Sequence, residues 1–202
     1  RTVTGVQTCA LPSCDGRILI TAASKFGARG IGVDLDENLI FNSEANAENA
    51  GVSKQVQFLL QDLFKTDLSK ATVITMYLLP GVNMRLRPVL LKLKPGTRIV
   101  AHDFDLGDWK PDVKITVRKN VMLWVVPAKV EGRWRLQLPL AGGNQTWELD
   151  IRQKHQEIDG VVRAGDRPPG GIWQASLSGD KVSFVLVDNT DRENEANLYF
   201  EG

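Results

Sequence analysis

The sequence predicts an α/β fold, in which helices cover both faces of a doubly wound, mostly parallel sheet, followed by a small antiparallel β unit. Three observations lead to this prediction. Helix-like and strand-like segments alternate from Asp15 to about Asp112. Acidic residues follow three of the predicted strands, at Asp34, Asp62 and Asp103. Beyond Asp112 the pattern changes to short alternating runs separated by glycine turns, which is typical of antiparallel β structure.

The other elements are organised around the stretch from Asp15 to Asp36. A turn containing Gly16 opens an apolar helix over 18–26, and a buried strand over 30–33 ends in Asp34. In doubly wound sheets the ligand binds at the carboxyl ends of the strands, where such an acid accepts hydrogen bonds from ribose hydroxyls. The first hypothesis is therefore a cofactor that contains adenosine.

The following segments continue the alternation. Asp36 is placed to cap a helix at its N-terminus, and Gly51 to end the same helix. The further predicted elements are strand 56–60, strand 71–79, helix 82–94 with Pro88 near its start or at a kink, and strand 98–103.

The second half of the chain carries seven short alternating runs and no helix signal. The predicted strands are 114–118, 122–126, 133–138, 146–152, 160–163, 172–177 and 182–187. We expect the first of them to complete the parent sheet and the rest to form a barrel or a sandwich. The predicted domains are residues 1–127 and 128–188. Residues 189–202 are expected to be a mobile tail whose end resembles an altered protease-cleavage tag.

The first 14 residues fit poorly with the rest of the chain. Residues 3–11 can form a strand that leads into the turn, but the segment also resembles the translated adapter sequence that contaminates assembled metagenomic reads. We therefore expect that it replaces or truncates the natural start, so a signal peptide in the natural chain would not be visible.

Composition excludes several classes of protein. The chain has 202 residues, with 25 Lys and Arg against 24 Asp and Glu, so no net field attracts nucleic acid. No apolar run reaches the roughly 18 to 20 residues of a membrane helix, and a cytoplasmic location is expected. Two cysteines and two histidines argue against a disulfide framework or a metal centre.

Between residues 10 and 112 the sequence resembles the class I, Rossmann-like methyltransferases that depend on S-adenosylmethionine. The similar pieces, in order, are Asp15-Gly16-Arg17, Gly32-Val33-Asp34-Leu35-Asp36, Gln61-Asp62-Leu63-Phe64, Tyr77-Leu78-Leu79-Pro80 and Leu93-Lys94-Pro95-Gly96. The order and spacing look most like bacterial proteins of the group that includes seven-strand lysine methyltransferases acting on mitochondrial carrier and ATP synthase subunits.

The resemblance implies roles for individual residues. Asp34 would bind the ribose hydroxyls, Leu35 would pack on the adenine, and Asp62 would accept a hydrogen bond from the adenine amino group with Leu63 beside it. Asp15 and Gly16 would lie near the methionine end of S-adenosylmethionine.

The same resemblance implies a methyl-transfer site. Tyr77 and Pro80 would line it, and His102 with Asp103 would serve an amine acceptor, either as a proton acceptor or as a structural pair. Trp109 and Phe104 are further candidates for an aromatic lining of the sulfonium. The methyl acceptor is expected to be a protein lysine or a small molecule.

One departure from the family pattern stands out. The family loop reads Asp-x-Gly-x-Gly where this chain has Ala10, Pro12 and Cys14, which predicts weakened cofactor binding. Two alternatives therefore remain open. The chain can be a non-catalytic binding module with a relic cofactor site, or a nicotinamide-dependent oxidoreductase, although Gly16 is not followed by the glycines of a dinucleotide loop.

Overall fold

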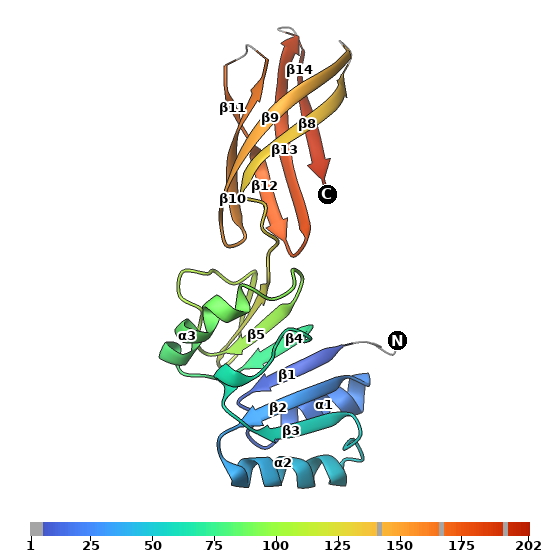
Figure 1. The fold of residues 1–202 in the computed structure, drawn as a ribbon, viewed down its shortest axis with the longest axis vertical. Helices are drawn as coiled ribbons and strands as arrows, with labels where there is room; N and C mark the ends of the chain where they lie inside the picture. The colour runs from blue at the N-terminus through green and yellow to red at the C-terminus, as the bar shows by residue number, and fades with distance from the viewer. Residues whose placement is uncertain (1–5, 141–142, 166–167, 192–193) are drawn as a thin grey trace. The chain divides into compact units, whose positions relative to one another are not determined.

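The computed structural model describes residues 6–140, 143–165, 168–191 and 194–202. The chain forms two compact units, Arg1–Val126 and Pro127–Gly202, which are coloured blue to green and yellow to red in Figure 1. In the described part of the chain, no helix is long and apolar enough to span a membrane.

The first unit is built on a seven-stranded sheet with the order β3-β2-β1-β4-β5-β7-β6. Its strands are β1 Gln7–Leu11, β2 Arg29–Asp34, β3 Val56–Leu60, β4 Val73–Met76, β5 Arg98–His102, β6 Val113–Thr116 and β7 Asn120–Val125. Strands β1 to β5 pair in parallel, whereas β7 runs antiparallel to both β5 and β6. The carboxyl ends of the five parallel strands therefore share one edge.

Helices cover both faces of this sheet, which confirms the predicted α/β class. Helices α1 (Arg17–Phe26) and α2 (Glu37–Asn49) pack Leu19 and Ile40 against Phe58 on one face. Helix α3 (Pro80–Leu90) packs Leu86 with Ile99 in a separate cluster on the other face. Because neighbouring strand residues point to opposite faces, a single strand such as β1 supplies both clusters.

Local signals explain where these helices begin and end. The carboxylate of Asp36 accepts from the N–H of Asn38 at 2.9 Å and caps α2, which ends just before Gly51 at φ 70°. Strand β4 is shorter than predicted and α3 begins earlier, because Pro80 takes the first helical position, where its missing N–H costs nothing. Pro88 lies inside α3, close to its end.

The second unit is a β-sandwich and not a barrel. Its sheets have the orders β11-β10-β9-β8 and β12-β13-β14. The strands are β8 Gly132–Leu140, β9 Gly143–Lys154, β10 Glu157–Ala164, β11 Gly170–Gly171, β12 Trp173–Ser178, β13 Lys181–Asp191 and β14 Asn194–Glu201. Trp147 and Leu149 of β9 meet Phe184 and Leu186 of β13 in one apolar cluster between the sheets.

The prediction of a mobile tail over residues 189–202 is wrong. Strand β14 pairs with β13 from Ser183↔Glu201 to Asp191↔Asn194. The ring of Phe200 stacks on that of Phe184 at 5.2 Å, while Tyr199 is 75% exposed. The alternation of Leu198, Tyr199 and Phe200 is that of a half-buried strand, and it outweighs the polar composition of the segment.

Candidate functional site

The turn between β1 and α1 lies at the carboxyl edge of the sheet. The N–H of Ser13 donates to the carbonyl of Val33 at 2.9 Å, which ties the turn to the neighbouring strand β2. From α2, the hydroxyl of Ser43 donates to the carbonyl of Cys14 at 2.9 Å. Cys14 has a φ of 51°, in the left-handed region where glycine is favoured. The backbone thus keeps a glycine-like conformation at a position where the sequence has a side chain.

Gly16 is required where it stands. It precedes α1 with a φ of 77°, and a Cβ built on it would lie 2.8 Å from Cζ of Phe58. Beside it, the carboxylate of Asp15 pairs with the guanidinium of Arg17 at 2.6 Å. This hydrogen-bonded partner lowers the pKa of Asp15 below its ordinary value. Asp15 is therefore held as a carboxylate at the start of the helix.

Asp34 organises the same edge through backbone amides. Its carboxylate accepts from the N–H groups of Cys14 at 3.1 Å, Leu35 at 2.9 Å and Asp36 at 3.2 Å. The side chain of Leu35 is 74% exposed, although it is large and apolar. A recessed carboxylate beside an open apolar side chain is the combination that a ribose and an adenine ring require.

Asp62 lies next to this group. The N–H of Gln61 donates to the carbonyl of Asp34 at 2.9 Å, so the end of β3 follows the end of β2. Asp62 accepts from the N–H of Phe64 at 2.9 Å and caps η1 (Leu63–Lys65), in which Leu63 is half-buried. The guanidinium of Arg85 lies 4.3 Å from the centre of the Phe64 ring.

The predicted acceptor residues lie on the next two strands along the edge. Tyr77 follows β4 and is 52% exposed, and its ring meets that of His102 edge-to-face at 4.7 Å. Pro80 is exposed at the first turn of α3. Within the described residues Nδ1 of His102 is buried and has no hydrogen-bond partner. The structure therefore brings Tyr77, His102 and Asp103 together, with Pro80 three residues further along the chain than Tyr77.

The three acids do not converge on one ligand atom. Asp103 follows β5, and the order β2-β1-β4-β5 places it three strand spacings from Asp34, about 14 Å. Asp34 and Asp62 form one group on the cofactor side, and Asp103 belongs to the acceptor side. Trp109 is fully buried in the core and its carbonyl accepts from Nε1–H of Trp124, so its expected place in the sulfonium lining is wrong.

Sequence reasoning missed Lys119. Its ammonium lies 2.6 Å from the carboxylate of Asp103, and this hydrogen-bonded partner raises the pKa of Lys119 above its ordinary value. Lys119 is in the turn between β6 and β7, and only the antiparallel pairing of β7 with β5 brings that turn to the end of β5. No local pattern in the sequence predicts this register.

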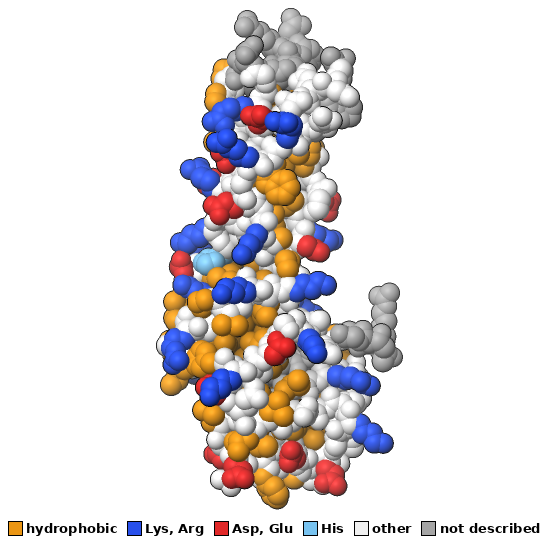
Figure 2. Space-filling model, in the orientation of Figure 1, with side chains coloured by type: hydrophobic (Ala, Val, Ile, Leu, Met, Phe, Trp, Pro, Cys, Tyr) orange, Lys and Arg blue, Asp and Glu red, His pale blue; other side chains and the backbone are white. Residues whose placement is uncertain are grey.

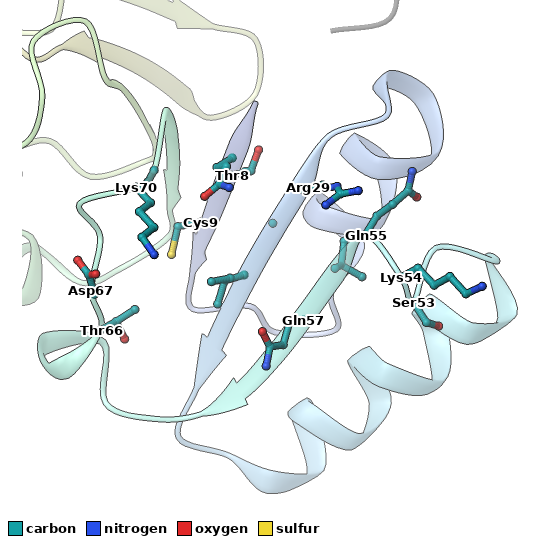
Figure 3. A pocket seen from close by; sticks show the side chains of 15 residues that line it. Thr8, Cys9, Arg29, Ser53, Lys54, Gln55, Gln57, Thr66, Asp67 and Lys70 are labelled. Carbon is teal, nitrogen blue, oxygen red and sulfur yellow. The ribbon is translucent and has the colours of Figure 1, made fainter. Parts of the chain in front are cut away.

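A pocket of about 430 Å³ lies elsewhere on the sheet (Figure 3). Arg29, Gln55 and Gln57 line it from β2 and from the start of β3, and Asp67 and Lys70 line it from the segment before β4. None of the predicted cofactor residues borders it. The pocket exists because the chain between β3 and β4 contains only the short η1, which leaves this face of β1 to β3 partly open.

The residues at the carboxyl edge fit S-adenosylmethionine at its adenosine half. Asp34, Leu35, Asp62 and Leu63 lie on adjacent strand ends, as the ligand needs. In the turn, the hydroxyl of Ser13 is buried and has no hydrogen-bond partner among the described residues, which is suited to a polar ligand group.

The surface carries charges of both signs. Figure 2 shows Lys and Arg side chains intermixed with Asp and Glu on the visible face. In the β unit, cross-strand pairs such as Arg152 with Asp159 at 2.7 Å account for part of this mixture.

Comparisons with known proteins agree with this geometry. Residues 11–113 match the ANTKMT methyltransferase domain. A protein-lysine N-methyltransferase of Saccharolobus islandicus is 43% identical over 110 residues, which are 54% of this chain and 68% of that protein. A lysine N-methyltransferase of Mus musculus, named for an ATP synthase subunit, is 34% identical over 50% of this chain and 40% of that protein.

A solved structure adds the fold. An RNA methyltransferase from Salinibacter ruber, in complex with S-adenosyl-L-homocysteine, matches with a TM-score of 0.61 and 46% identity. The match covers 62% of this chain and 83% of that one. The curated relatives match about half of this chain. From these matches and from the acids at the carboxyl edge, the chain belongs to the ANTKMT methyltransferase domain family, within the class I methyltransferases.

Proposed function

We propose that the first unit transfers a methyl group from S-adenosylmethionine to the side-chain amine of a protein lysine. The observation that carries the proposal is the hydrogen bond from the N–H of Cys14 to Asp34. It joins the loop that would face the methionine end to the acid that would hold the ribose. Membership of the family makes the protein a methyltransferase that depends on S-adenosylmethionine, and the lysine acceptor is the finer step.

The chain's own residues would bind the cofactor in two parts. Asp34 would hold the ribose hydroxyls and Asp62 the adenine amino group, with Leu35 against the ring. Charge-assisted hydrogen bonds of this kind are worth about 1.5 to 3 kcal/mol each when they are well shielded. Gly16 lets the backbone pass close to Phe58, and it starts α1 below the methionine end.

The acceptor side suits an amine. Methyl transfer from a sulfonium is an in-line displacement, in which positioning supplies most of the acceleration. The amine's lone pair forms the new N–C bond as the S–C bond breaks, and the ammonium proton must leave beforehand. Tyr77 offers an aromatic surface to the cation, and His102 and Asp103 are close enough to orient the amine and accept its proton.

Two measurements test the proposal. Calorimetric titration of S-adenosylmethionine into the wild-type chain and into Asp34→Ala should give binding that the variant weakens. Incubation of a cell lysate with cofactor labelled in the methyl group, followed by acid hydrolysis, should place the label in methyl-lysine. Absence of cofactor binding in a folded wild-type chain would instead favour the relic binding module.

RNA is the second candidate acceptor. The observation in its favour is the 46% identity to a protein described as an RNA methyltransferase. Treating the labelled lysate with ribonuclease separates the two acceptors, because label in RNA is released and label in methyl-lysine is not. The balanced charge of this chain favours the protein acceptor.

A further inference from the structure

The Lys119–Asp103 ion pair lies where the acceptor's amine would have to bind. The carboxylate of Asp103 is recessed, with 18% of the side chain exposed, while Lys119 reaches it from the solvent side and is 57% exposed. Asp103 is held in place because its N–H donates to the carbonyl of Asn120 at 2.7 Å and its φ is 69°. A fixed carboxylate is thus covered by an ammonium on a movable stem.

The turn that carries Lys119 is itself ordered. The hydroxyl of Thr116 donates to Oδ1 of Asn120 at 2.8 Å, across the ends of β6 and β7. The N–H of Val117 donates to the carbonyl of Lys119 at 3.4 Å, which closes the turn. The backbone of Lys119 is therefore anchored at the carboxyl end of β5, and only its side chain has to move to uncover Asp103.

Tyr77 completes a receptor for an amine. Asp103 contributes most to the raised pKa of Lys119, and the charge of Tyr77 contributes further, so the two side chains are near one another. A carboxylate next to an aromatic ring is the arrangement that attracts an alkylammonium. Exposed apolar side chains lie on both flanking segments, with Leu79 at 68% and Val117 at 85% exposure. They suit the aliphatic stem of a lysine.

We propose that Lys119 occupies the subsite of the acceptor's ammonium in the resting enzyme, and that the incoming lysine must displace it from Asp103. Lys119 is then an internal competitor that selects for acceptors with a positively charged amine. This inference rests on the proposed lysine methylation. Because ion pairs between exposed side chains are weak, the competition should raise the acceptor KM by only about threefold.

The kinetic test uses a lysine-containing peptide as acceptor. Lys119→Met keeps the length of the side chain and removes its charge, so the acceptor KM should fall about threefold while kcat is little changed. Lys114→Met is the matched control, since it removes one charge from the exposed face of β6 in the same hairpin. Asp103→Asn should raise the acceptor KM, because the subsite itself is lost. An unchanged or raised KM in Lys119→Met would overturn the inference.

A second measurement does not depend on activity. The side-chain ammonium signal of Lys119 can be assigned by NMR through its loss in Lys119→Met. Titration with n-butylammonium chloride should move this signal to the position that it has in Asp103→Asn, whereas sodium chloride at the same ionic strength should not. A signal that responds equally to both salts would overturn the inference. Methyl-lysine formation with no response in either test would refute the competitor and leave the proposed function standing.

Discussion

Replacing Asp34 separates cofactor binding from helix capping. In Asp34→Ala the ribose partner is lost, together with the acceptor for the N–H groups of Cys14, Leu35 and Asp36. Loss of charge-assisted hydrogen bonds to the ribose should cost about 1.5 to 3 kcal/mol of binding free energy. At about 1.4 kcal/mol per tenfold, this is a weakening of about 10- to 150-fold.

Asp36→Ala is the matched comparison. It removes the cap of α2, in which the carboxylate accepts from the N–H of Asn38, and should lower the free energy of unfolding by about 1 kcal/mol. Cofactor affinity should hardly change. Titration calorimetry gives the affinities, and urea denaturation gives the stabilities. Equal losses of affinity in the two variants, or a larger loss in Asp36→Ala, would refute the assignment of Asp34 to the ribose.

Three further outcomes are expected. Changing Pro12 and Cys14 together to glycine should tighten S-adenosylmethionine binding about tenfold or more, because Pro12 lacks an N–H and Cys14 holds a left-handed φ; unchanged affinity in a folded variant would contradict this. Burial first, and then nearby carboxylates, raise the pKa of the Cys14 thiol, so its alkylation by iodoacetamide should be slower than that of a free thiol at about pH 8.5, speed up as the pH rises above 9.0, and slow further when cofactor is added. Trp124→Phe should lower the free energy of unfolding by about 1 to 3 kcal/mol, since it leaves the carbonyl of Trp109 buried without its partner, and Trp173→Phe on the exposed face of β12 is the control.

Local signals in the sequence were sufficient for the helices and for the cofactor side. The cap at Asp36 and the glycine at Gly51 act over a few residues, and strand β3 follows from the short apolar run at 56–60 alone. Asp34 and Asp62 could be named as binding residues because parallel strands that alternate with helices align their carboxyl ends. The predicted class follows from the same alternation.

The sequence by itself therefore determined the α/β class, the order of the elements and the acids at their ends. Only the tertiary structure decided that Lys119 meets Asp103, that Trp109 is in the core, and that the final segment is strand β14. Caps, turns and periodicity depend on neighbours within one or two turns of chain, so they can be read locally. Pairing between distant segments depends on a register that both partners set together, and a shift of one residue would point every side chain to the other face.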